Sequence, residues 1–536
     1  MMKAAVKIAY FCMEYGLESS VKIYSGGLGI LAGDHLKAAK DQQVPLVGIG
    51  LKWKMGYVEQ RVTEKGKVMD CFSPTEYPEM KDTGILIHIN IREDKVPLKV
   101  WKLEAFGNVP LYLLDADVAG SPYHWATRQL YGGTEEERVA QEIVLGAGGV
   151  KVLEALGIEP ETYHFNEGHA VLAGIALIRQ EMNQGSDFHT AWKKTRKKIV
   201  FTTHTPIPAG NESHTMERLR YMGAHQGLTI EQLAEIGGVP FNMTVAGLRL
   251  SRKANSVAAL HLETTKTMWK QVKKKAKLIN ITNGVHGPTW MDPRFNDDEL
   301  NVESIEKIHH ENKIKLLEEV ERRTGVKLNE DSLLIGFARR AAPYKRSNLI
   351  FSNPAIIDPL LESKRVQILF AGKAHPMDEK GKAIIRALVL KQKEFPESVV
   401  FLEDYDMDLG ALLTRGCDVW LNNPQRPKEA CGTSGMKAAM NGVLNVSILD
   451  GWWPEICQHG VNGWAIGDEV VPHDEAEQDE RDARHLYHVL TEEVIPTFET
   501  DKEKWSRMMI KSIQDTRVAY SASRMVKDYC EKLYNI

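Results

Sequence analysis

Short apolar runs alternate with amphipathic segments along most of the 536-residue chain. The apolar runs predict strands at Lys7–Met13, Pro45–Gly50, Lys198–Thr203, Ser332–Phe337, Val366–Ala371, Ser398–Leu402 and Val443–Leu449. Helical spacing lies between them, as in Glu136–Leu156 and Gly381–Glu394. Because such alternation is typical of parallel sheets covered by helices, the pattern predicts an α/β fold.

The chain is too long for one ordinary hydrophobic core, so we expect two domains. Glycines and a proline mark a loop at Thr282–Pro288, and only helical patterns follow Asp479. We expect an N-terminal α/β domain over residues 1–290, a C-terminal α/β domain over residues 291–500, and C-terminal helices over residues 501–536. Whether these last helices pack back on the N-terminal domain stays open at this stage.

Composition narrows the function classes. Apolar residues make up 43% and charged residues 26%, with a net charge of −4, which is typical of a globular protein and gives no sign of a nucleic-acid partner. The six cysteines form no CxxC pair, so we expect neither a metal site nor a disulfide framework. No apolar stretch reaches the ~20 residues that span a bilayer. We therefore expect a cytoplasmic protein.

Two segments are candidates for anion binding. Ser25–Asp34 is a glycine-rich loop that opens a helix, where a phosphate and a purely structural turn are equally good interpretations. Arg339–Arg346 places four cations after a predicted buried strand, at the sheet edge where open α/β folds bind ligands. Arg and Lys are the usual phosphate-binding side chains, so anion binding is favoured over a solvated surface for this segment.

The segment Lys428–Gly442 contains an unusual lysine. Its small residues predict a loop that leads into a short helix, with Lys437 in the first turn among apolar neighbours. A desolvated lysine has a lowered pKa and forms Schiff bases, whereas a lysine that extends its ammonium group to solvent is the commoner case. The residues alone favour the second interpretation. The loops at Asn166–His169, His204 and Asn283 carry further polar groups, which serve either structure or ligand binding.

Taken in order, these motifs closely resemble those of the glycogen, starch and maltodextrin phosphorylase family. The resemblance runs from about Phe11 to the C-terminus and is most specific at Glu429–Lys437, where the family carries its pyridoxal phosphate lysine. Arg339–Arg346 matches the family's basic segment, and Gly26–Gly29 matches its glycine loop. The resemblance implies two Rossmann-like, doubly wound domains of the GT-B type facing a central cleft.

The resemblance also implies a function and its residues. The enzyme would cleave α-1,4-glucan or maltooligosaccharide chains with inorganic phosphate, releasing α-D-glucose 1-phosphate with retention of configuration, as a homodimer. Because few residues precede the predicted strand Lys7–Met13, we also expect no phosphorylation control through an N-terminal tail. The phosphate of pyridoxal 5′-phosphate would act beside the substrate phosphate. The cofactor would be held by Lys437, Arg339, Thr433, Ser434 and Gly435. Substrate phosphate would be bound by Arg340 and Lys345 with Gly26 and Gly27, and glucose by Asn283, His204, Glu429 and Gly432.

One alternative keeps the same architecture. A retaining nucleotide-sugar glycosyltransferase of the glycogen synthase type shares two α/β domains, an early glycine loop and a glutamate near the ligand. Such an enzyme has no use for a lysine at position 437, so bound pyridoxal phosphate separates the two hypotheses.

Overall fold

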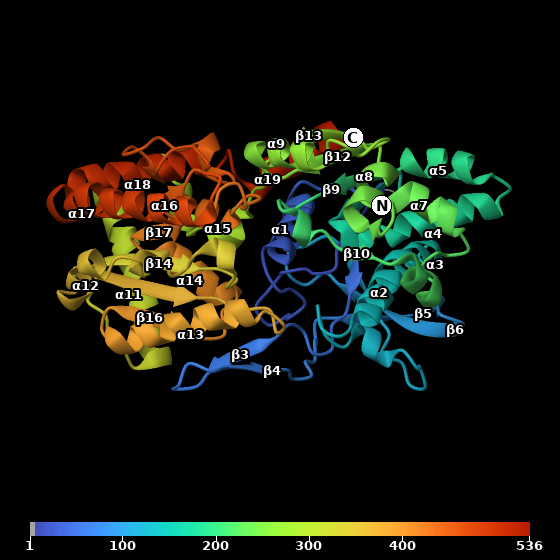
Figure 1. The fold of residues 1–536 in the computed structure, drawn as a ribbon, viewed down its shortest axis with the longest axis horizontal. Coiled ribbons are helices and arrows are strands. Elements are labelled where there is room, and N and C mark those ends of the chain that lie inside the picture. Colours follow the sequence, from blue (N-terminus) through green and yellow to red (C-terminus); the bar gives the residue numbers. More distant parts are fainter. Residues whose placement is uncertain (1–5) are drawn as a thin grey trace. The chain divides into compact units, whose positions relative to one another are not determined.

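The computed structural model describes residues 6–536, apart from the side chain of Ala209. The chain forms two compact units (Figure 1). The first unit comprises the residues through Tyr57, Phe72–Thr282 and Met525–Ile536, and the second comprises Val58–Cys71 and Asn283–Arg524. The domain bounds at residues 290 and 500 stay predictions.

The first unit is built on a nine-stranded sheet. Its strand order is β13 (Lys277–Asn280), β12 (Lys253–Ser256), β9 (Ile199–Thr202), β8 (Thr162–Asn166), β1 (Ile8–Phe11), β2 (Leu46–Leu51), β7 (Leu111–Asp115), β6 (Asp94–Leu103) and β5 (Lys81–Ile91). The strands from β13 to β7 pair in parallel, and β7, β6 and β5 pair antiparallel. The carboxyl ends of the parallel strands therefore share one edge, where ligand-binding loops are expected.

Helices of the first unit connect these strands. They are α1 (Gly27–Asp41), α2 (Glu135–Ile143), α3 (Gly149–Ala155), α4 (Leu172–Asn183), α5 (Phe188–Arg196), α6 (Met216–Met222), α7 (Ile230–Gly237), α8 (Met243–Leu250) and α9 (Ala259–Met268). A capping box at Thr134 starts α2, because its hydroxyl accepts from the Glu137 amide while the Glu137 side chain returns to the Thr134 amide. The predicted helix Glu136–Leu156 is thus confirmed as α2, a π-helical turn and α3.

The second unit holds a six-stranded sheet whose strands are all parallel. Its order is β16 (Val399–Leu402), β15 (Val366–Ala371), β14 (Leu333–Ala338), β17 (Val419–Asn422), β18 (Leu444–Ile448) and β19 (Gly463–Ile466). Nearly every residue of these strands is buried, as in sheets covered by helices on both faces. The two large sheets confirm the predicted α/β class.

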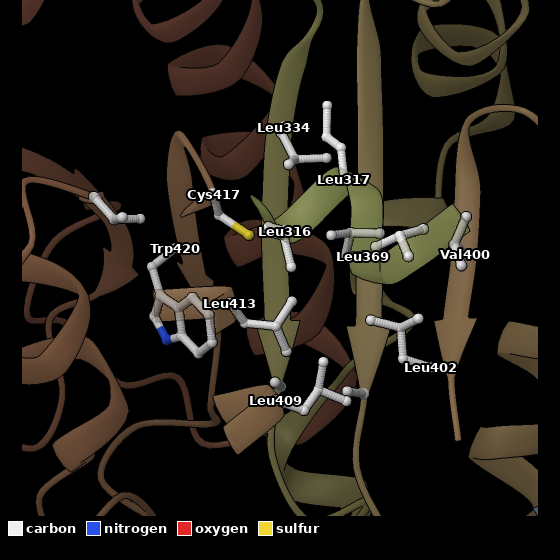
Figure 2. Packing of buried hydrophobic residues seen from close by; sticks show 14 of the residues in the cluster. Leu316, Leu317, Leu334, Leu369, Val400, Leu402, Leu409, Leu413, Cys417 and Trp420 are labelled. Carbon is white, nitrogen blue, oxygen red and sulfur yellow. The ribbon is translucent and has the colours of Figure 1, made fainter. Parts of the chain in front are cut away.

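The helices of the second unit are α10 (Gly287–Trp290), α11 (Val302–Thr324), α12 (Pro354–Glu362), α13 (Glu379–Glu394), α14 (Met407–Gly416), α15 (Thr433–Met440), α16 (Glu475–Val489), α17 (Ile495–Thr500) and α18 (Lys502–Thr516). Leucines of α11 and α14 pack on one face of the sheet, against Leu334, Leu369 and Leu402 (Figure 2). The side chains of Cys417 and Trp420 extend this core along β17.

A β-hairpin from the N-terminal part of the sequence belongs to the second unit. Its strands are β3 (Glu59–Val62) and β4 (Val68–Cys71). The Gln60 side chain exchanges two hydrogen bonds with the Ala374 main chain, at 2.8 and 2.9 Å, and Asp70 pairs with Lys382 at 2.8 Å. These contacts attach the hairpin to the region of β15 and α13.

The C-terminal segment is helical, as predicted. Helix α18 packs on α11 and α15 of the second unit, and α19 (Ala522–Tyr529) leads into the last residues of the first unit. There the Tyr534 hydroxyl lies 2.7 Å from Nδ1 of His164, and the Tyr529 hydroxyl accepts from Asn255 at 3.0 Å. Among the described residues, no helix combines the length and the apolar character that crossing a membrane requires.

Candidate active site

Three charged side chains meet in the second unit. Arg339 follows β14, Lys345 ends a short 3-10 turn, and Glu429 lies in the loop between β17 and α15. The Glu429 carboxylate accepts from Nη2 of Arg339 at 2.6 Å and from Nζ of Lys345 at 2.7 and 2.9 Å. Asn422, the last residue of β17, also hydrogen-bonds Arg339. The ends of two neighbouring strands thus bring together residues that are 90 positions apart.

The cations determine the ionisation of Glu429. Burial alone would raise the pKa of this carboxyl group, but the charges of Arg339 and Lys345 hold its pKa at about 2. Glu429 also donates its main-chain N–H to Asp450 at 2.9 Å. Burial and the Glu429 charge raise the pKa of Asp450 to about 7. Arg339 and Lys345 contribute +2 and Glu429 −1, so the cluster of these three keeps a surplus positive charge.

The other two cations of the basic segment lie in different surroundings. Arg346 is buried and binds the main-chain oxygens of Asn423 and Pro424 at 2.8 Å, together with Asp479 and Asp482. This arginine therefore joins the loop after β17 to α16. Arg340 is exposed. The four cations therefore differ in their surroundings. Arg339 and Lys345 pair with Glu429, Arg346 connects a loop to a helix, and Arg340 is exposed.

Lys437 lies in the last turn of α15, so the prediction that it occupies the first turn is wrong. The helix begins at Thr433 and is only eight residues long. Lys437 is 7% exposed, and its Nζ lies 3.2 Å from the ring centroid of Trp290. The Asn441 side chain donates to the main-chain oxygens of both residues, at 2.8 and 3.1 Å. An aromatic face stabilises a desolvated ammonium group, so the lysine is held inside the unit.

The start of α15 is shaped by glycine. Gly432 has a φ of +89°, which side-chain-bearing residues rarely adopt, and no side chain caps the helix. A Cβ on Gly435 would lie 2.7 Å from the Asn445 amide oxygen. The Ser434 hydroxyl accepts from the Trp420 indole at 3.3 Å. The helix therefore presents its first main-chain N–H groups without a capping side chain, which is the arrangement that binds anions.

Asn283 lies beside the same loop. It is buried, its main-chain oxygen accepts from Arg524 at 2.9 Å, and its main chain hydrogen-bonds the Cys431 thiol. Its side-chain oxygen Oδ1 is buried without a hydrogen-bond partner, and the same is true of Nε of Arg339. Buried polar atoms are nearly always paired, so a water or a polar ligand would satisfy these two atoms.

The glycine loop belongs to the first unit. Glu14 accepts from the amides of Ser25 and Gly26 at 2.5 and 3.1 Å and from the Tyr131 hydroxyl at 2.7 Å. A Cβ on Gly26 or Gly27 would meet nothing within 4 Å, whereas one on Gly29 would lie 2.6 Å from Glu14. Packing within the unit thus requires Gly29 but leaves Gly26 and Gly27 open to the approach of a ligand.

His204 lies in the loop that follows β9. Its Nε2 is 2.7 Å from the Asn166 amide oxygen, and its main-chain N–H donates to Glu167 at 2.7 Å. Glu167 also accepts from Gly168 and from the Thr205 hydroxyl. Burial lowers the pKa of His204 to about 3, so its imidazole is neutral. The Asn166–His169 loop therefore positions the His204 loop.

The fold brings some of the sequence candidates together within one unit. The Glu429 loop gathers Arg339, Lys345, Gly432 and Asn283 in the second unit, whereas Gly26, Gly27 and His204 belong to the first. Sequence reasoning missed Glu14, Trp290 and Asp450. Glu14 and Asp450 had a signal, because each comes directly after a predicted strand, where a polar residue at the sheet edge is a candidate, whereas Trp290 had none.

Comparisons with known proteins agree with this picture. A family model for carbohydrate phosphorylases matches residues 292–488. Maltodextrin phosphorylase of Thermococcus litoralis is 38% identical over 98% of this chain and 70% of its own length. Glycogen phosphorylase of Mycobacterium bovis is 36% identical over 98% of this chain and 70% of its own length. Glycogen phosphorylase of Aquifex aeolicus is 36% identical over 98% of this chain and 86% of its own length.

Proposed function

The chain belongs to the carbohydrate phosphorylase family and is a glycosyltransferase, and we propose that it cleaves α-1,4-glucan or maltodextrin chains with inorganic phosphate to release α-D-glucose 1-phosphate. The relatives that carry the names glycogen phosphorylase and maltodextrin phosphorylase support this substrate class. The observation that carries the proposal is the cluster of Arg339, Lys345 and Glu429. Its surplus positive charge suits a phosphate, and its carboxylate can accept a hydrogen bond from a sugar hydroxyl.

Pyridoxal 5′-phosphate is the cofactor that the resemblance implies, and the residues of the second unit fit it. Lys437 supplies a buried amine, the uncapped start of α15 supplies main-chain N–H groups, and Arg339 has an unpaired buried Nε. We propose that Lys437 holds the cofactor covalently, and that Arg339, Thr433, Ser434 and Gly435 surround its phosphate. When bound, the cofactor supplies a second phosphate group next to the reacting one.

The remaining cations would bind the phosphate that reacts. We propose that Lys345 and Arg340 hold it, with the main chain of Gly26 and Gly27 as further donors. Nζ of Lys345 hydrogen-bonds the Glu429 carboxylate, so a bound phosphate would compete with Glu429 for this ammonium group. Bound phosphate would donate a proton to the glycosidic oxygen as the bond from that oxygen to the anomeric carbon breaks, so that the shortened chain leaves with a hydroxyl group. A phosphate oxygen would then bond to the same face of the anomeric carbon, which retains the α configuration. Anionic groups that lie close together need cations around them, which accounts for the basic segment.

Several polar groups are candidates for binding the sugar. We propose that Glu429, Asn283, the Gly432 main chain and His204 contact glucose. The orphaned Oδ1 of Asn283 supports this role, because a sugar hydroxyl would satisfy it. His204 is neutral, so it serves as a hydrogen-bonding group rather than as a cation.

The alternative of a nucleotide-sugar glycosyltransferase is not favoured, since the named relatives at 36–38% identity are phosphorylases. A cytoplasmic location and a homodimer remain part of the proposal. All six cysteines are free, which suits a reducing compartment. Sedimentation velocity of the purified chain measures the oligomeric state directly.

The experiment that tests the function is phosphorolysis of maltooligosaccharides of increasing length, with the released glucose 1-phosphate and the bound cofactor both quantified. We expect phosphate-dependent release from the longer oligosaccharides and close to one cofactor per chain. Glucosyl transfer from a nucleotide sugar, without any phosphate-dependent release, would support the alternative instead.

A further inference from the structure

A cluster of potential metal ligands lies apart from the residues assigned above. Glu142 is in the last turn of α2, His214 is in the short strand β10 (Ser213–His214), and Glu212 precedes that strand. One ligand atom from each of the three lies within 4.8 Å of the others, so α2 and β10 are neighbours (Figure 1). Nε2 of His214 lies 2.8 Å from a carboxylate oxygen of Glu142. All three residues belong to the first unit.

The cluster is buried and incompletely paired. Glu142 is 0% exposed and His214 is 3% exposed. The second carboxylate oxygen of Glu142, Oε1, is buried without a hydrogen-bond partner. A fully buried carboxylate with an unpaired oxygen is costly, because water no longer solvates its charge. This oxygen is therefore an observation beyond the mere proximity of the three side chains.

The charges of the cluster also do not balance. Two carboxyl groups, Glu142 and Glu212, share one guanidinium group, because Nε of Arg138 lies 3.1 Å from Glu212, so a proton or a second cation must complete the cluster. A neutral imidazole is the form that binds metals. The cluster thus offers one imidazole and two carboxyl groups to a cation.

We propose that Glu142, Glu212 and His214 bind one divalent transition-metal ion, of which Zn²⁺ is the best match. Imidazole and carboxylate are both ligands that Zn²⁺ takes, with bonds of about 2.0–2.2 Å, which places ligand atoms of a tetrahedral site about 3.3 Å apart. Side-chain shifts of about 1 Å would bring the present atoms to that spacing. Glu212 is partly exposed, which gives the ion a way in and leaves room for a water as the fourth ligand.

The ion would act as a structural anchor. Glu212 and His214 lie at the end of the connection that starts at His204, and Glu142 lies on α2. On the other side, the Glu212 main-chain oxygen accepts from the Met243 amide at 2.9 Å. A metal ion bound to Glu142 would therefore attach the end of this connection to α2, in addition to its hydrogen bond with Met243. The inference does not depend on the proposed function.

The test is metal content after equilibrium dialysis of the full chain against Zn²⁺, measured by mass spectrometry of the element. We expect one tightly held ion in the wild type, and binding weaker by about tenfold or more in Glu142→Gln and in His214→Gln, because each loses a ligand. Glu136→Gln is the matched control, since Glu136 lies on the same helix but pairs with Arg92 outside the cluster. It should bind like the wild type.

A second measurement keeps the inference testable if a variant folds poorly. Anomalous diffraction at the zinc edge of wild-type crystals should place a peak between the three side chains. Two results would overturn the proposal: no saturable ion in the wild type, which would leave a proton shared by Glu142 and Glu212 as the missing charge, or an ion bound at other residues and retained in both variants.

Discussion

Buried glutamates of the two units differ in their partners. Glu429 in the second unit is held by two cations, Arg339 and Lys345, and its pKa lies near 2. Glu14 in the first unit is equally buried, but its partners are neutral donors: the amides of Ser25 and Gly26 and two hydroxyl groups. Burial therefore dominates there, and the pKa of Glu14 is raised.

The difference shows how one residue type serves two purposes. A carboxylate that accepts from amides fixes a loop, as Glu14 does for the glycine loop. A carboxylate between cations holds them in position before an anion binds. The anion then meets positive charge that is already in place. The first unit thus contains a main-chain loop fixed by a carboxylate, and the second contains cations already held in place.

The largest expected effect is at Lys437. Lys437→Arg keeps the positive charge near Trp290 but cannot form the covalent bond, so phosphorolysis should fall about a thousandfold or more. Borohydride reduction followed by peptide mapping should place the cofactor mass on Lys437 in the wild type and nowhere in the variant. A label on another lysine in the wild type would refute the assignment.

The next effect concerns the cation pair. Lys345→Met leaves Glu429 with Arg339 alone, and breaking a buried ion pair from one side costs about 3–5 kcal/mol. We expect a lower midpoint of thermal unfolding and a phosphate KM higher by about tenfold to a hundredfold. Lys382→Met is the matched control, because that lysine pairs with Asp70 outside the cluster and should leave the phosphate KM unchanged. Equal KM values in both variants would exclude Lys345 from phosphate binding.

The pH dependence of stability should have opposite signs in the two units. The pKa of Glu429 is depressed from 4.5 to about 2, so its contribution of about 3 kcal/mol is present above pH 4.5 and is lost as the pH falls toward 2. The destabilisation caused by Glu429→Gln should therefore be constant near neutrality and shrink below pH 4.5.

The pKa of Glu14 is raised, so its contribution is present below pH 4.5 and is lost as the pH rises through the folded-state value. Glu14→Gln should accordingly become more stable relative to the wild type as the pH rises. Thermal unfolding of both variants between pH 3.5 and pH 8 measures the two trends. Parallel trends would mean that the partners of the two glutamates do not control their ionisation.

The smallest effect separates two glycines of one loop. Gly27→Ala meets open space, so it should leave stability unchanged while raising the phosphate KM by about tenfold. Gly29→Ala meets Glu14 at 2.6 Å and should cost about 1–3 kcal/mol of stability through overpacking. Denaturant unfolding and initial rates distinguish the two. A normal phosphate KM in Gly27→Ala would remove this loop from the phosphate site.

The local pattern of the chain predicted much of the fold. The strand predicted at Val366–Ala371 matches β15 to the residue, and the helix Gly381–Glu394 is α13 with two more residues at its start. Periodicity suffices for such buried, regular elements. The assignment of the β3–β4 hairpin to the second unit had no local signal, because it rests on contacts such as Gln60 with Ala374, far apart in sequence.

The candidate site was predictable only where a motif carried it. The basic segment was indicated by its cations after a predicted strand, and the covalent role of Lys437 came from the resemblance. Sequence could not separate Arg346, which binds the loop after β17, from Arg339, which pairs with Glu429. Arg339 lies near Glu429 because β14 and β17 are neighbours in the sheet, and this pairing of strands is not visible in the local sequence. Trp290 was missed for the same reason, since its contact with Lys437 crosses nearly 150 residues.

The central claim is that the charge prepared in the second unit serves phosphorolysis of a glucan. Phosphorus NMR of the enzyme with maltoheptaose and inorganic phosphate follows both the phosphate and any sugar phosphate in one sample. We predict a growing resonance of α-D-glucose 1-phosphate, matched by loss of inorganic phosphate, and growth slower by about tenfold or more in Lys345→Met at the same low phosphate concentration. A product of β configuration, or no sugar phosphate despite bound cofactor, would contradict the account.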